Sequence, residues 1–281
     1  MESIYQAKHR LIQYPTLTIS LFLTVILLIM LTLGPIIVAH DPFQINMTNR
    51  LQSASMSHIL GTDQLGRDLF SRILYGGRLT VGLGLIAILL ALLIGVPIGL
   101  ISGYIGGKLD AFFMRIVDGI IVFPDFILAI AIAGILGPSL TNIVIAIVLV
   151  KWIVYARVVR GLVMAEKEKE FILAAKISNS SIGKIIRRHL WPQIIPDVVA
   201  MAAIDVGKVI LIISTLSYIG VGAQPPIPEW GALLNDGRGY FQVHASLMIY
   251  PGLAIMATVL CFNLLGDGVK EYMDPRKGGK S

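Results

Sequence analysis

The chain has 281 residues, of which 56% are hydrophobic and 14% are charged, and its mean hydropathy is +0.80. This composition excludes an ordinary soluble domain and indicates a polytopic membrane protein. The single cysteine, Cys261, excludes an intrachain disulfide. The net charge of +6 is explained by the loop charges described below and requires no nucleic-acid partner.

Two long stretches in the first part of the chain carry no charge. One lies between Arg10 and His40, the other between Arg78 and Lys108, and each contains 29 residues. Because a helix crosses a bilayer with about 20 apolar residues, each stretch predicts a membrane span. The first span, 16–39, is predicted to be a retained anchor, since its apolar core exceeds the roughly 7–15 residues of a secretory signal.

Residues 40–77 are predicted to form an extracytoplasmic segment that ends in an amphipathic helix over 66–75. Apolar residues recur there at helical spacing, and Thr62 and Asp63 are good helix caps. The polar positions of this helix are candidates for a docking or gating surface: Arg67, Asp68 and Arg72.

The second span carries Gly95, Gly99 and Gly103 on one helical face. This spacing lets helix backbones approach closely in lipid, so the face is predicted to pack against a neighbouring helix. The same span contains a match to a dinucleotide-binding fingerprint over 82–87. That fingerprint requires a preceding strand, so we expect no cofactor site in this chain.

The third apolar region runs from Phe112 to Tyr155 and is too long for one helix. Gly137-Pro138-Ser139 is predicted to divide it into two spans. Two further apolar runs follow, at about 192–221 and 246–267. The sequence therefore predicts an all-α polytopic membrane protein with six transmembrane helices, five of them in a core over 78–268.

The distribution of Lys and Arg predicts the orientation, because these residues are enriched in cytoplasmic loops. With the N-terminal segment 1–15 placed in the cytoplasm, 16 of them fall inside and five outside. A loop at about 157–192 and the tail 269–281 are then cytoplasmic as well.

Four charged residues fall near the middles of the predicted spans: Asp125, Lys151, Asp205 and Lys208. Ionisable groups at such depth usually face a bundle interior or a wet cavity. Asp205 and Lys208 are three residues apart and share a helix face, and Pro124 predicts a kink beside Asp125. The sequence leaves open whether the four are structural ion pairs or cargo contacts in a translocation path.

A second extracytoplasmic segment, 222–244, contains three closely spaced prolines just before Trp230. Prolines impose a stiff, extended chain. The segment is either a rigid connector or a docking or gating surface, and in the second case Pro226 and Trp230 are its contact candidates.

The five histidines show no metal-ligand spacing, so no metal centre is expected. His40 and Asp41 are nevertheless predicted to face the outside, where they could touch a cargo. The sequence shows no Ser/His/Asp or paired-carboxylate arrangement either, and we expect a non-enzymatic chain.

The most informative stretch is a polar and basic insert between long apolar runs, Glu170 to Pro192, with the sequence EFILAAKISNSSIGKIIRRHLWP. It resembles the EAA loop of bacterial ABC-importer permeases, which docks on a cytoplasmic ATPase. The candidate coupling residues on this resemblance are Glu170, Ala174, Ala175, Asn179, Gly183 and Arg187.

Two further blocks carry the same resemblance. One is Gly61–Asp68 with Ser71-Arg72 and Tyr75–Arg78, and the other is Leu216–Gly222 with Gln224-Pro225-Pro226 and Trp230-Gly231. Together with the insert, they are similar to peptide/nickel-type ABC-importer permeases, specifically the dipeptide-permease C-type subunit.

The resemblance implies a type I importer fold with a cytoplasmic coupling helix, in a bacterial inner membrane. It implies four kinds of partner: the lipid bilayer, a second homologous permease subunit, two ATPase subunits that hold ATP and Mg, and an extracytoplasmic binding protein. The implied cargo is di- or oligopeptides, nickel or metal-chelator complexes. The sequence departs from the EAA pattern at Leu173 and Asn179, and Asn tolerates the left-handed backbone of the motif's turn.

Two other functions are compatible with the composition. An ion-coupled secondary transporter would use the intramembrane Asp and Lys residues as a relay, but such carriers often show internal repeats, and we detect none. A passive membrane scaffold would lose no transport activity when the insert is altered.

Overall fold

The computed structural model describes residues 14–273, and within this range the chain is helical apart from loops and one isolated bridge between Thr62 and Asp68. The helices are α2 (Pro15–Ile37), η1 (Met47–Asn49), α3 (Leu69–Ile105), α4 (Gly107–Ile121), α5 (Asp125–Leu136), α6 (Leu140–Glu166), α7 (Glu170–Ile177), α8 (Ile182–Ile185), the π-helical turn η2 (Ile186–Leu190), α9 (Trp191–Tyr218), α10 (Trp230–Arg238) and α11 (Ser246–Met273). Most of the predicted N-terminal segment 1–15, and the tail beyond Met273, lie outside the described residues.

Five helices among the described residues are long and apolar enough to cross a membrane, and there are six spans if α4 and α5, bent by 89° at the break between them, count as one. Pro124, which directly precedes α5, has no backbone N–H to continue the helix. The predicted kink beside Asp125 is therefore a complete break. The predicted division at 137–139 is confirmed, because α5 ends at Leu136 and Ser139 caps α6.

The helix that follows the α2–α3 segment (38–68) differs from the prediction. Asp68, and not Thr62 or Asp63, is its cap, since Asp68 Oδ2 accepts from Ser71 N at 2.8 Å. The helix then runs without interruption from Leu69 to Ile105. The expected boundary between an outer segment ending at 77 and a core beginning at 78 therefore falls inside one helix.

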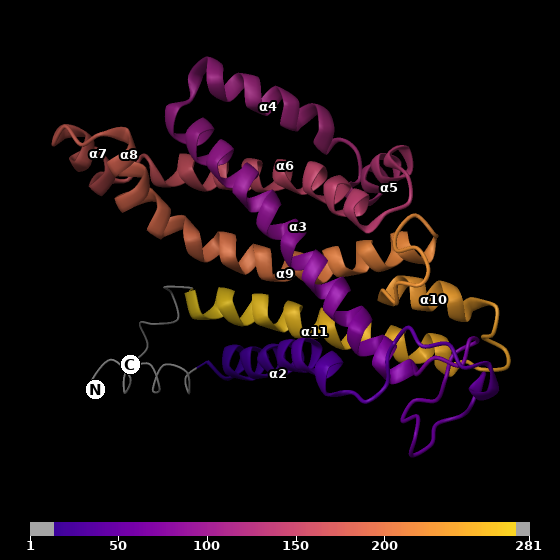
Figure 1. Ribbon diagram of the computed structural model, residues 1–281. Helices are drawn as coiled ribbons and strands as arrows, with labels where there is room; N and C mark the ends of the chain where they lie inside the picture. The colour runs from indigo at the N-terminus through magenta and orange to yellow at the C-terminus, as the bar shows by residue number, and fades with distance from the viewer. Residues whose placement is uncertain (1–13, 274–281) are drawn as a thin grey trace.

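Helix α3 runs obliquely across α6 and α9, while α11 lies between α9 and α2 (Figure 1). The predicted glycine face is what brings α3 onto α6. A Cβ atom added to Gly95 or Gly99 would lie only 2.4 Å or 2.6 Å from a backbone oxygen of α6, that of Trp152 or Ala156. The close approach expected from the glycine spacing is confirmed.

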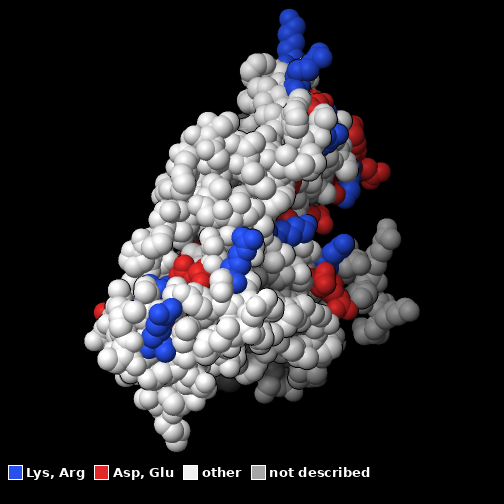
Figure 2. Space-filling model, turned by 90° about the vertical axis from the view of Figure 1, so that its right-hand side faces the viewer, with Lys and Arg blue, Asp and Glu red and all other residues white. Residues whose placement is uncertain are grey.

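The two ends of the molecule carry different structures. Helices α7 and α8 project at one end, and the α2–α3 segment lies with α10 at the other (Figure 1). In the view of Figure 2, charged side chains gather in a few groups separated by broad uncharged surface. Large apolar side chains such as Phe22, Ile36 and Leu93 are exposed on the long helices, as a bilayer requires.

Candidate functional site

A charged cluster lies where α5, α6 and α9 meet. Lys151 Nζ donates to Asp125 Oδ2 at 2.9 Å and lies 3.9 Å from Asp205 Oδ1. Lys208 Nζ is 3.4 Å from the same Asp205 oxygen, and the hydroxyl of Tyr155 donates to Asp205 Oδ2 at 3.1 Å. The four residues predicted near mid-span are thus one ion-paired group, and the predicted pairing of Asp205 with Lys208 is confirmed.

The side chains of this cluster differ in their exposure, which the sequence did not indicate. The side chains of Lys151 and Asp205 are 6% and 4% exposed, whereas that of Lys208 is 61% exposed. An exposed ion pair contributes about 0–1 kcal/mol, but a buried charge that loses its partner is strongly destabilising. Lys151, which lies within 4 Å of two carboxylates, is therefore the buried cation of the cluster, and its loss is expected to cost more than that of Lys208.

The cluster lines a cavity of about 340 Å³, and a second hollow of about 460 Å³ adjoins it. Both are lined by Asp197, Ala200 and Lys270, and the second one reaches Glu166 and Lys169 beside α7. Together they form a polar track of mixed charge from the middle of α6 and α9 to the end of the molecule that carries α7. The sequence singled out neither Asp197 nor Lys270.

Helix α7 presents two different faces. Ile172 and Ala175 are buried and pack in a core cluster with Ile185 and Leu190 of the following turns. On the other side Leu173, Ala174 and Ile177 are exposed, with Ile177 exposed by 87%. An apolar face of this kind on a short projecting helix is typical of a docking surface.

The predicted coupling residues, which lie in α7 and in the turns after it, differ in exposure. Glu170, Ala174, Gly183 and Arg187 are exposed and stay candidates for a contact with a partner. Ala175 is buried in the chain's own core, and the expectation that it lies at a partner contact is wrong. Asn179 has φ = 54°, which confirms the left-handed turn expected for this position.

The candidates of the α2–α3 segment are buried as well. Arg67 Nε donates to Asp63 Oδ2 at 2.7 Å, and the guanidinium groups of Arg67 and Arg72 lie 3.6 Å and 3.5 Å from Asp236 of α10. Arg67, Asp68 and Arg72 are each at most 4% exposed. The prediction that they contact a partner directly is corrected: Arg67 and Arg72 join the start of α3 to Asp236 of α10, whereas Asp68 caps α3 and pairs with His58.

The prediction that Trp230 contacts a partner directly is corrected in the same way. It is 1% exposed, its Nε1 donates to Ile73 O at 2.8 Å, and its ring lies where a Cβ of Gly77 would be, 2.4 Å from the nearest ring atom. It therefore joins α10 to α3 inside the molecule. Pro226 and its neighbour Ile227 are exposed and remain candidates for an outer contact.

The model of the family described as "Binding-protein-dependent transport system inner membrane component" matches residues 95–279. The match begins within α3 and includes the charged cluster, the polar track and the α7–α8 segment. The chain belongs to this family.

Three relatives extend the similarity to most of the chain. This chain is 39% identical over 266 residues to the probable D,D-dipeptide transport system permease protein DdpC of Escherichia coli K12, covering 95% of this chain and 89% of the relative. It is 40% identical to the dipeptide transport system permease protein DppC of Alkalihalophilus pseudofirmus, with 86% and 80% covered, and 38% identical to the nickel transport system permease protein NikC of E. coli K12, with 84% and 85% covered.

The permease also contains a buried carboxylate that the sequence did not single out. Glu229 is 0% exposed, caps α10 by accepting from Ala232 N at 3.1 Å, and accepts from Thr80 Oγ1 of α3 at 2.9 Å. Burial raises the pKa of Glu229 above its ordinary value of 4.5, although the hydrogen bonds from Gly231, Ser217 and Thr80 oppose the shift.

This raised pKa predicts a pH dependence of stability. Between the unfolded and the folded pKa of Glu229 the folded permease binds more protons than the unfolded chain, so its stability falls as pH rises through that window. Glu229→Gln should remove this part of the dependence. We would compare unfolding temperatures from about pH 4.5 to about pH 8, with exposed Glu168→Gln as the control. Equal pH profiles for wild type and Glu229→Gln would contradict the prediction.

Proposed function

We propose that this permease is one of two homologous membrane subunits of an ATP-driven importer in a bacterial inner membrane. Two ATPase subunits that bind ATP and Mg power the transport, and an extracytoplasmic binding protein delivers the cargo. The permease itself is non-catalytic. The observation that carries the proposal is the α7–α8 segment, whose buried face is anchored in the permease core while Leu173, Ala174 and Ile177 stay exposed.

In this proposal α7 lies in a cleft of one ATPase, at the cytoplasmic end of the molecule. Its inner face packs against α9 through the turns of 182–190, so a displacement of α7 by the ATPase is passed to α9. Helix α9 carries Asp205 and Lys208. Closure and opening of the ATPase pair would then rock the helices around the charged cavity as rigid bodies, which alternates its access between the two sides.

The polar track favours a cargo that carries both charge signs. Asp125, Asp197, Lys208 and Lys270 line it, so a zwitterionic di- or oligopeptide, or a metal ion held by an amino-acid-like chelator, would meet complementary groups along it. Peptide and nickel transport are the functions named for the relatives. The exposed turn at Pro226 and Ile227 is the proposed contact of the binding protein or outer gate.

The alternative of an ion-coupled secondary transporter is less well supported. The ion pairs among Asp125, Lys151, Asp205 and Lys208 account for the charges at mid-span without a relay. Family membership also favours the importer.

Substitution of Ala174 by glutamate tests the coupling surface. A charged side chain at this exposed apolar position should block docking of α7 without disturbing the permease core, because Ala174 is exposed whereas the neighbouring Ala175 is buried. We expect at least a tenfold loss of co-purified ATPase and of cargo-stimulated ATP hydrolysis, which corresponds to about 1.4 kcal/mol of binding free energy.

The matched control is Ala165→Glu, which introduces the same group at an exposed alanine of α6, outside the α7–α8 segment. It should leave both quantities near the wild-type level. Wild-type co-purification and ATP hydrolysis in Ala174→Glu would refute the proposed contact.

A further inference from the structure

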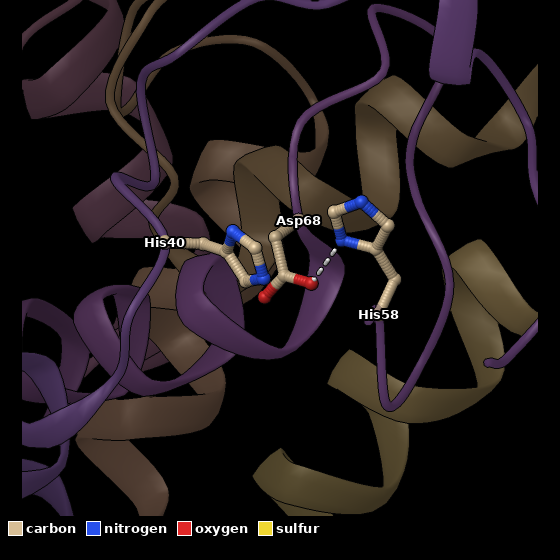
Figure 3. A group of neighbouring side chains, drawn as sticks. All are labelled: His40, His58 and Asp68. Carbon is tan, nitrogen blue, oxygen red and sulfur yellow. Dashed lines mark hydrogen bonds and ion pairs between the residues drawn. The ribbon is translucent and has the colours of Figure 1, made fainter. Parts of the chain in front are cut away.

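Two histidines and an aspartate come together at the end of the molecule opposite α7. His40 follows α2, His58 lies in the loop after η1, and Asp68 caps α3. Figure 3 shows the carboxylate of Asp68 between the two imidazole rings. His58 Nδ1 lies 2.9 Å from Asp68 Oδ1, and the ring centroids of His40 and His58 are 4.8 Å apart.

The three side chains offer a set of metal ligands. One nitrogen of each histidine and one oxygen of Asp68 all lie within 4.8 Å of one another. Ligands bound to one ion at about 2.0–2.2 Å are themselves about 3–4 Å apart, and His58 and Asp68 already have nearly this separation. His40 is exposed, and its ring would have to move to close the remaining distance. Its Nε2 now lies 2.8 Å from Ser57 O.

Asp68 and His58 are fixed by contacts within the molecule, whereas the side of the three residues that includes His40 is open to solvent. Asp68 is held in place because its second oxygen, Oδ2, accepts from Ser71 N and Ser71 Oγ at 2.8 Å and 2.6 Å, and His58 is buried. The open side faces a hollow of about 210 Å³ whose lining includes the oxygen-bearing side chains of Asp41, Gln44, Asn46 and Asn49. This hollow has room for water, the usual source of further ligands.

The chemistry of the ligands selects the class of ion. Imidazole nitrogens prefer borderline ions such as Zn²⁺ and Ni²⁺, whereas Mg²⁺ and Ca²⁺ prefer sites made of oxygen alone. Imidazole binds a metal ion in its neutral form, so the carboxylate of Asp68 supplies the one negative charge of the ligand set, and Asp41 lines the same hollow.

We propose that His40, His58 and Asp68 form a binding site for a divalent transition-metal ion of the Zn²⁺/Ni²⁺ class. The site is separate from the charged cavity, and it stands whether or not the permease transports a metal. A bound ion would join the end of α2 to the first turn of α3 and so hold the α2–α3 segment closed. The hydrogen-bonded arrangement would then be the metal-free form of the site.

The test is Zn²⁺ binding to the full-length permease purified from membranes with its partner subunits, without the binding protein, after treatment with a chelator. Isothermal titration and metal analysis should show one saturable Zn²⁺ per permease that excess Mg²⁺ or Ca²⁺ does not displace. His40→Ala should weaken the affinity at least tenfold. Because His40 is exposed, this change leaves the packing intact, which size-exclusion elution would check.

Two further variants make the result specific. Asp68→Asn keeps an oxygen that can cap α3 but removes the charge, and it should also weaken Zn²⁺ binding. His244→Ala removes a histidine of the α10–α11 loop that is not part of this group, and it should bind Zn²⁺ as the wild type does. Absence of saturable Zn²⁺ binding in the wild type, or unchanged affinity in His40→Ala, would overturn the proposal and leave a hydrogen-bonded helix cap.

Discussion

Lys151→Met should sharply reduce the amount of folded permease in the membrane. Lys151 is the buried cation between Asp125 and Asp205, at 2.9 Å and 3.9 Å from their oxygens. Removing it leaves two carboxylates near each other without the cation between them. Breaking a buried pair in this way costs about 3–5 kcal/mol, a large part of the stability of a typical protein. Membrane abundance and the unfolding temperature of the purified chain would measure the loss.

The double variant Lys151→Met/Asp205→Asn distinguishes a stranded charge from lost packing. If the loss comes from the surplus negative charge of Asp125 and Asp205, which Lys208 alone then faces, neutralising Asp205 as well should recover much of the abundance. Lys208→Met is the matched control, because Lys208 faces the same Asp205 oxygen but is largely exposed, and it should cost at most about 1 kcal/mol. Strictly additive losses would show that Lys151 and Asp205 do not interact.

Uptake measured on the same variants separates structure from transport. Recovery of both abundance and uptake in the double variant would assign the cluster a purely structural role. Recovery of abundance without uptake would assign it a contact with cargo, as the mixed charge of the cavity favours.

Gly99→Leu is the second change with a large expected effect. A Cβ at Gly99 would lie 2.6 Å from Ala156 O and 2.8 Å from Val159 Cβ, so α3 and α6 would have to separate. Overpacking costs about 1–3 kcal/mol and more where backbone must move, and we expect about 3 kcal/mol or more here. Because α3 and α6 share the most extensive helix–helix contact among the described residues, the folded permease should be nearly lost.

The control for this change is on the same helix. Gly82→Leu introduces the same side chain where a Cβ meets nothing within 4 Å, and it should be tolerated. Membrane abundance measured in parallel would decide, and similar abundance of the two variants would show that the α3–α6 contact is more plastic than the structure indicates.

Properties of single segments were predictable because each depends on a few neighbouring residues. Hydropathy identified the long helices, and the proline before Asp125 predicted a kink at the point where the third span breaks. The glycine spacing of α3 identified its packing face, because only glycine permits backbones to approach so closely. The left-handed backbone of Asn179 followed from the conformational tolerance of asparagine.

Which side of a segment is covered was not predictable, because it depends on residues far away in the chain. Ala174 and Ala175 are equivalent in sequence, yet only Ala175 meets the turns of 182–190. Trp230 is an aromatic residue in a predicted outer segment, and aromatic residues often anchor protein contacts. In the structure it is buried, because the missing side chain of Gly77 leaves room for its ring.

The sequence by itself determined the class of protein, its spans and the segment that resembles a coupling loop, since these follow from local composition and motif. Only the tertiary structure decided which charges form a cluster and which histidines meet. Lys151 became the centre of the buried charges because α5, α6 and α9 converge on it. His40, His58 and Asp68 came together because the α2–α3 segment folds back on the first turn of α3, and the long-range contacts that close such a segment leave no periodic signal in the chain.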